Sequence, residues 1–98
     1  KDDIIKTRGE KVAPKEVEAV LYRLPGVVEA AVIGVPDPLL GQSIKAFLVC
    51  APDANLSERD VLRHCAQHLE DFAMPRQIVF RKELPKTESG KVQKRTLE

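Results

Sequence analysis

The run from Val27 to Val35 limits the possible folds more than any other part of the chain. It consists of Val, Ala, Ile and Gly with a single charge, Glu29. Such a run predicts a strand that is covered on both faces, as in the centre of a sheet. A chain of 98 residues has the length for one modest hydrophobic core around that strand, so we expect a single domain.

Helical periodicity on either side of this run predicts two amphipathic helices. The first begins at Pro14, a residue tolerated in the first helical turn, and ends before Pro25-Gly26. The second begins after Ser57, which forms a capping-box pattern with Asp60. The apolar stripes of the two helices are Val17, Val20, Leu21 and Leu24, and Val61, Leu62, Cys65, Ala66 and Leu69.

Short β-prone segments complete the pattern. Residues 44–50 and 77–81 predict two more strands, residues 4–12 predict a hairpin that turns at Gly9-Glu10, and a short helix is expected from Lys91. We therefore expect an α+β fold: a small, mostly antiparallel sheet of about three strands with helices packed on it, preceded by a short two-stranded hairpin.

Charge is unevenly distributed along the chain. The formal net charge is +1, yet residues 76–98 carry seven basic and three acidic side chains. This basic end predicts an anionic partner, with a merely solvated cationic surface as the alternative. Nucleic acid is not expected as that partner, because the four aromatic residues offer no stacking platform and two of them, Phe47 and Phe80, fall in expected core strands.

Several further classes of protein are disfavoured. The apolar stretches are too short to span a bilayer and there is no signal peptide, so no transmembrane segment is expected. Cys50 and Cys65 form neither a disulfide framework nor a CxxC half-site, which favours a reducing compartment and a cytoplasmic location. The chain begins without Met and ends within a helical pattern, so we expect a piece of a longer protein.

A metal site is not expected either. His64 and His68 lie one helical turn apart, a spacing that can bind zinc, but no third ligand is evident and Cys65 falls on the apolar stripe. Asp2 and Asp3 are neighbours in an extended segment, so their side chains point to opposite faces and do not form an acid/base pair.

The segment from Pro85 to Val92 is the best candidate for chemistry. Its Gly90-Lys91 pair resembles part of a phosphate-binding loop, but Pro85 and Val92 stand where the GxxxxGK[ST] pattern requires Gly and Ser or Thr. What remains is Lys91 beside a flexible Ser89-Gly90 pair, a cation suited to phosphate or carboxylate oxygens. From the residues alone, a solvated loop lysine is the alternative.

Two long motifs resemble those of a known family. The first is Asp2-Asp3-Ile4-Ile5-Lys6-x-Arg8-Gly9-Glu10-Lys11-Val12-x-Pro14-x-Glu16-Val17-Glu18, and the second is Pro85-Lys86-Thr87-x-Ser89-Gly90-Lys91-Val92, with Leu24-Pro25-Gly26-Val27 and Pro36-Asp37 between them. Essentially the whole chain resembles the small C-terminal domain of the AMP-forming adenylating enzymes. These include acyl-CoA synthetases, adenylation domains of nonribosomal peptide synthetases, and luciferases.

The resemblance implies a two-step reaction of a full-length enzyme. A carboxylate attacks the α-phosphate of ATP, which is bound with Mg, to give an acyl adenylate and pyrophosphate. A thiol, usually that of coenzyme A, then displaces AMP to give a thioester. In the family, the lysine that matches Lys91 enters the active site only for the first step, so the resemblance implies a catalytic role for Lys91, with Ser89 and Gly90 supporting its loop. An ammonium between two anionic groups lowers the barrier electrostatically.

The resemblance also implies that this domain rotates before the second step. The pivot matches Asp2, and the surface then presented to the thiol and its pantetheine arm contains Arg8, Gly9 and Glu10, with Lys6 at its border. Gly9 would let the backbone lie close to the pantetheine arm. The position of Arg8 is often occupied by a small residue in relatives, so this chain departs from the pattern there.

From this resemblance we expect residues 1–12 to form the hinge and hairpin, 13–84 the α+β core, and 85–98 the catalytic-lysine loop and terminal helix. The expected function is that of an acyl-CoA synthetase, with a fatty acid as one candidate substrate. The expected partners are an N-terminal domain outside this chain, which binds most of the ATP, together with ATP, a carboxylic acid and coenzyme A. Residues 1–98 alone should be inactive. The alternatives are an adenylation domain that loads a carrier protein and, from a different class, a ferredoxin-like module that binds a small ligand.

Overall fold

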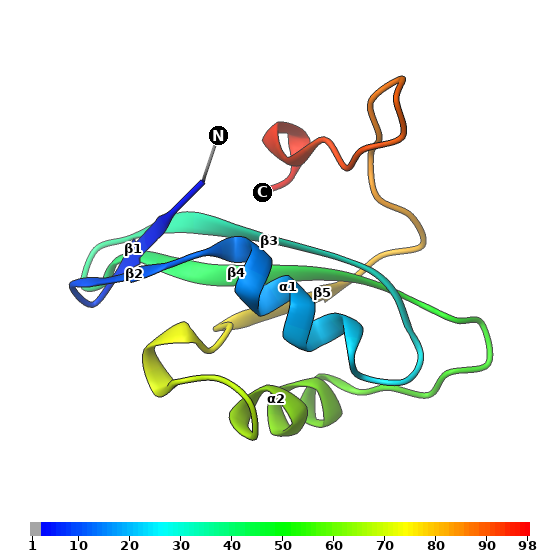
Figure 1. Cartoon of the computed structure of the whole chain (residues 1–98), viewed down its shortest axis with the longest axis horizontal. Coiled ribbons are helices and arrows are strands. Elements are labelled where there is room, and N and C mark those ends of the chain that lie inside the picture. Colours follow the sequence, from blue (N-terminus) through cyan, green and yellow to red (C-terminus); the bar gives the residue numbers. More distant parts are fainter. Residues whose placement is uncertain (1–2) are drawn as a thin grey trace.

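The structure, a computed structural model, describes residues 3–98. The hinge predicted at Asp2 therefore lies outside the described residues. Among residues 3–98, no helix is both long enough and apolar enough to cross a membrane. The elements, shown in Figure 1, are β1 (Ile5–Thr7), β2 (Glu10–Val12), α1 (Pro14–Tyr22), β3 (Val27–Asp37), β4 (Gly41–Cys50), α2 (Glu58–Ala66), a 3-10 turn (Asp71–Ala73), β5 (Gln77–Phe80) and a second 3-10 turn (Lys94–Thr96).

The strands form one sheet around β4. Strand β3 runs antiparallel to β4 from Val27 to Asp37, and β5 pairs with β4 in parallel. The β1–β2 hairpin joins the same sheet, because Thr7 of β1 pairs with Gly41 at the start of β4. The expected α+β class and mostly antiparallel sheet are confirmed. However, the sheet has five strands rather than about three, since the hairpin is continuous with it instead of preceding it.

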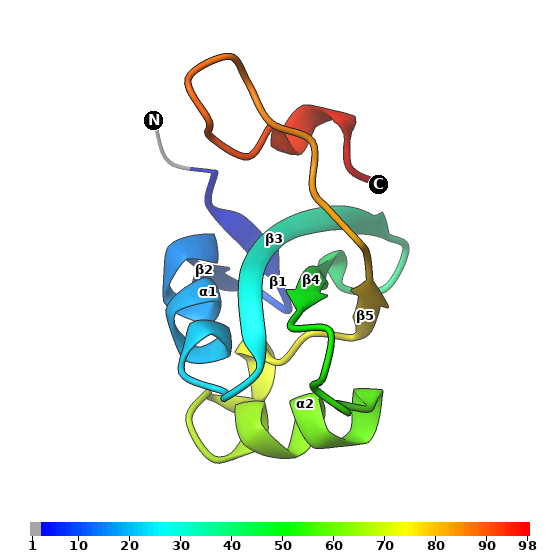
Figure 2. The same cartoon turned by 90° about the vertical axis from the view of Figure 1, so that its right-hand side faces the viewer.

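Strand β3 is at an edge of the sheet, so the central position predicted for residues 27–35 is wrong. The run is apolar because both of its faces are covered. Ala30 and Val32 pack into the cluster formed with α1 and α2, whereas Ala31 packs with Leu84 and Leu97 from the C-terminal segment. Figure 2 shows the segment after β5 crossing the sheet on the side away from α2. An edge strand with two covered faces has the composition of a central one.

Side chains of α1 cover the free edge of β3. The N–H of Ala30 donates to the Tyr22 hydroxyl at 3.1 Å, and the N–H of Val32 donates to Oε2 of Glu18 at 2.8 Å. Exposed strand edges with free N–H groups invite pairing with other chains. Helix α1 thus both contributes to the core and satisfies donors that would otherwise be unpaired.

The ends of the helices follow the sequence closely, with one exception. Helix α1 begins at Pro14, and α2 has the predicted capping box, in which the Ser57 hydroxyl accepts from the Asp60 N–H at 3.1 Å. The helix expected from Lys91 is wrong. Val92 pairs with Lys86 in an isolated antiparallel bridge, which keeps the backbone extended, and only the short 3-10 turn Lys94–Thr96 forms.

One aromatic residue differs from its expected burial. Phe47 is buried in β4, but Phe80, which the sequence places in a core strand, is 42% exposed. The reason is position: Phe80 is the last residue of β5, whose only strand partner among the described residues is β4.

Candidate functional site

Residues 85–92, which we call the lysine loop, form a closed turn. The bridge between Lys86 and Val92 closes its base. Within it the Thr87 N–H donates to the Lys91 carbonyl at 2.7 Å, and the Gly90 N–H donates to the Thr87 carbonyl at 2.9 Å. The Thr87 hydroxyl also lies 3.0 Å from the Ser89 hydroxyl and accepts from the Lys91 N–H at 3.3 Å. Gly90 has a φ of +91°, which favours glycine. These local bonds fix the backbone of Lys91.

The side chain of Lys91 is exposed and forms no ion pair with any residue from 3 to 98. Its neighbours behave differently: Lys86 Nζ lies 3.0 Å from Oε2 of Glu29, and Lys94 Nζ lies 2.7 Å from Oε2 of Glu18. Within the basic end of the chain, Lys91 is thus an ammonium that remains available to an external anion, whereas the charges of the two flanking lysines are compensated.

The residues predicted to face the thiol lie together in the β1–β2 hairpin. Its two-residue turn is Arg8-Gly9, one residue earlier than the predicted Gly9-Glu10, because Glu10 pairs with Thr7. Both turn residues have positive φ, +56° and +79°, as tight hairpin turns require. Lys6, Arg8, Gly9 and Glu10 are all exposed. A Cβ atom added to Gly9 would meet nothing within 4 Å in this domain. The backbone at Gly9 is therefore open to approach by another molecule.

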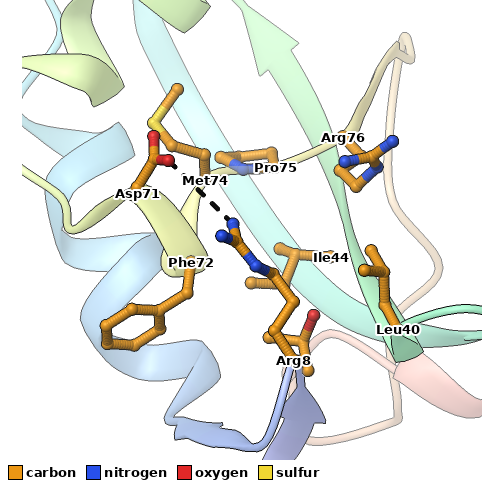
Figure 3. A pocket seen from close by; sticks show the side chains of 9 residues that line it. Arg8, Leu40, Ile44, Asp71, Phe72, Met74, Pro75 and Arg76 are labelled. Carbon is orange, nitrogen blue, oxygen red and sulfur yellow. Dashed lines mark ion pairs between the residues drawn. The ribbon is translucent and has the colours of Figure 1, made fainter.

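A pocket of about 270 Å³ lies beside this hairpin (Figure 3). Arg8 reaches across it towards Asp71, with 4.0 Å between Nη1 and Oδ2, and Arg76 lies on the neighbouring wall. The floor is apolar and includes Ile44 and Met74. No sequence pattern indicated Asp71 and Arg76 as site residues, because only the fold brings these distant segments beside the hairpin.

The two candidate sites are well separated. Figure 1 places the β1–β2 turn and the lysine loop towards opposite ends of the long axis, and Figure 2 again shows them apart. Lys91 and Gly9 therefore cannot contact the same reacting atoms simultaneously. Each would need its own orientation of the domain.

His64 and Cys65 of α2, and His68 just after this helix, make their contacts within the fold. His64 Nε2 donates to the Val20 carbonyl at 2.7 Å, and His68 Nδ1 accepts from Arg23 at 3.2 Å. Desolvation, and then the charges of Arg23 and His64, lower the pKa of His68. Burial raises the pKa of the Cys65 thiol to about 11, so it is not a nucleophile at neutral pH. Within residues 3–98, no three His, Cys, Asp or Glu side chains gather to hold a metal ion.

The chain is thus an α+β module that presents an exposed lysine, Lys91, without an ion pair to residues 3–98, on a loop held by its own hydrogen bonds. Comparison with known proteins identifies the module. A family described as "AMP-binding enzyme C-terminal domain" matches residues 16–91. The chain belongs to this family, and the resemblance noted from its motifs is confirmed.

Individual relatives agree with this assignment. Acetyl-coenzyme A synthetase of Bacillus subtilis is 45% identical over 100 residues, which cover 98% of this chain and 17% of that protein. Among solved structures, ATP-bound MatB from Rhodopseudomonas palustris has a TM-score of 0.94 at 40% identity, covering 98% of this chain and 19% of that one. The amide bond synthetase McbA from Marinactinospora thermotolerans has a TM-score of 0.93 at 35% identity, covering 98% and 19%. The chain thus spans less than a fifth of each of these relatives.

Proposed function

We propose that this chain acts as the C-terminal domain of an AMP-forming acyl-CoA synthetase. The observation that carries the proposal is Lys91, an exposed ammonium on a loop fixed by its own hydrogen bonds, in a chain that belongs to this family. The similarity to acetyl-coenzyme A synthetase of Bacillus subtilis supports a carboxylic acid and coenzyme A as substrates, with ATP as the activating nucleotide. A partner N-terminal domain would bind ATP with its Mg and form the acyl pocket.

Lys91 would act in the first step. The carboxylate oxygen attacks the α-phosphorus of ATP, a P–O bond forms, and the bond to pyrophosphate breaks. Two anions approach each other in this step, and negative charge spreads over both. An ammonium between them stabilises the transition state more than the separated reactants, and removal of such a contact typically lowers the rate by about 10²–10³.

The hairpin would act in the second step. The thiol sulfur attacks the acyl carbon, its proton leaves to solvent, and AMP departs with the pair of electrons of the broken C–O bond. Gly9 offers backbone without a side chain to the pantetheine arm, and the adjoining pocket between Arg8 and Arg76 offers cationic groups to phosphates of coenzyme A. Arg8 then contributes positive charge at the hairpin turn, and Lys6 and Glu10 lie on the exposed surface of the same hairpin.

The separation of the two sites supports rotation of the domain between the steps. Each step needs a different end of the domain at the substrates, and Asp2, at the start of the chain, is our proposed pivot. We further propose a cytoplasmic location, which fits a reduced Cys50 and Cys65.

The test separates the two half-reactions in the full-length protein. We expect Lys91→Ala to lower adenylate formation, followed by ATP–pyrophosphate exchange, by about 10²-fold or more, and to spare thioester formation from supplied acyl adenylate. Gly9→Leu should do the reverse. Lys15→Ala, which removes an exposed lysine of α1, is the control and should change neither rate.

Different results would identify a different function. Equal loss of both half-reactions in Lys91→Ala would contradict the assigned role. Transfer to a carrier protein but not to free coenzyme A would support the adenylation-domain alternative. Transfer only to an amine would place the protein with McbA, which is named an amide bond synthetase.

A further inference from the structure

We propose that two ion pairs, Lys86–Glu29 and Lys94–Glu18, act as a clamp that sets the position of Lys91 for adenylate formation. This inference rests on the proposed function of Lys91. In this proposal the four charged residues do not touch the substrates. They are positioning residues, which act through the lysine loop.

The pair at the start of the lysine loop is well built. Lys86 Nζ lies 3.0 Å from Oε2 of Glu29, and both side chains are about two-thirds buried. Glu29 sits where the register of β3 shifts relative to β4. Its other oxygen, Oε1, is buried and has no hydrogen-bond partner among residues 3–98, so Lys86 is the main source of stabilisation for this carboxylate. Partly buried pairs of this kind are screened less than surface pairs.

The pair after the lysine loop anchors it to α1. Lys94 Nζ lies 2.7 Å from Oε2 of Glu18, and this oxygen also accepts the Val32 N–H at 2.8 Å. The Glu18 side chain is only 16% exposed. The carboxylate of Glu18 is thus positioned by the Val32 N–H of β3, and it anchors Lys94 in the segment that follows the lysine loop.

Together the two pairs grip the loop on both sides of Lys91. The bridge between Lys86 and Val92 joins the two ends of the loop, so a shift of either end moves Lys91 as well. Buried Leu84 and Leu97 keep the whole segment on the sheet, and Val92, at the end of the loop, packs against the same apolar cluster. Apolar contacts have no preferred direction, so we assign the tilt of the loop to the two ion pairs, which are its charged contacts with β3 and α1 within the described residues.

This arrangement predicts a specific kinetic defect. A loop that stays folded but tilts would carry the ammonium away from its place, and a displacement of about 1 Å can lower a rate by about 10²-fold. Thioester formation does not use Lys91, so it should keep its rate. A merely structural pair would instead affect both steps together through loss of folded protein.

The experiment uses full-length protein with Lys86→Met, Glu29→Gln and the double variant. We expect each single change to lower the kcat of adenylate formation by about tenfold or more, with little change in the KM for ATP and in the rate of thioester formation from supplied acyl adenylate. The double variant should be no slower than the slower single variant, because both changes remove one pair. Lys86→Arg should restore most of the rate. Lys82→Met, at an exposed lysine without an ion pair to residues 3–98, is the matched control.

The outcomes separate this inference from the proposed function. If Lys91→Ala abolishes adenylate formation but Lys86→Met and Glu29→Gln keep the wild-type rate, the clamp is wrong and the function stands. Fully additive effects of the two changes, or equal loss in both half-reactions, would also overturn the clamp. If Lys91→Ala leaves adenylate formation intact, the proposed function fails, and the clamp fails with it.

Discussion

Glu18 offers the sharpest test of how this domain is stabilised. Its carboxylate accepts the Val32 N–H at 2.8 Å and pairs with Lys94 at 2.7 Å. Val32 has no exposed surface while Glu18 is in place, so its N–H relies on this carboxylate as its acceptor. Glu18→Ala should therefore leave a buried donor without a partner, whereas Glu18→Gln keeps an oxygen that can accept the N–H and removes only the charge.

The expected magnitudes differ between the two variants. An orphaned buried N–H costs about 1–3 kcal/mol. Loss of the partly buried ion pair costs roughly 1 kcal/mol, and the higher helix propensity of Ala returns a few tenths of a kcal/mol. We therefore expect Glu18→Ala to lower the free energy of unfolding by about 2–3 kcal/mol and Glu18→Gln by about 1 kcal/mol.

Urea unfolding of the 98-residue chain, followed by circular dichroism, measures both values. The slope of the free energy against urea should be the same in all three proteins, which shows that the midpoint shift reports stability. Added salt should narrow the gap between wild type and Glu18→Gln, since it screens the ion pair. If Glu18→Ala is no less stable than Glu18→Gln, the bond to Val32 does not stabilise the edge of β3 and our reasoning is wrong.

Two further predictions concern the core. The pKa of Cys65, raised by burial from 9.0 to about 11, means that the folded state keeps the thiol proton longer than the unfolded state, so stability should be complete below roughly pH 9 and fall by on the order of 2 kcal/mol as the pH approaches 11. Denaturant titrations of wild type and Cys65→Ala should show this loss only in wild type, and parallel pH profiles would contradict it. Gly26→Ala should cost about 2–4 kcal/mol, because φ is +100° and the new Cβ would lie 2.9 Å from Cβ of Ala54. Gly9→Ala, with a similar φ but open space, should cost only about 1 kcal/mol, and an equal cost at both positions would exclude the steric part of this account.

Local patterns were enough to predict much of the secondary structure and the lysine loop. The capping box of α2 joins Ser57 and Asp60, three residues apart, and the loop that carries Lys91 is held by bonds among residues 87–91. Interactions over so few residues depend on side chains that are adjacent in the sequence. The same locality explains the error after Lys91, where the pairing of Val92 with Lys86 overrides a weak helical pattern.

The sequence by itself determined the class of fold, the two long helices, the existence of the N-terminal hairpin and the candidate lysine. Only the tertiary structure decided that β3 lies at an edge where side chains of α1 bind its N–H groups, and that Asp71 and Arg76 lie beside Arg8. It also decided that Glu29 and Glu18 form ion pairs with the lysines on either side of Lys91. The physical reason is that periodicity records which face of an element is apolar but not which neighbour covers it. Charged partners from distant segments likewise have no characteristic separation in the sequence, because the packing of the elements between them sets their distance in space.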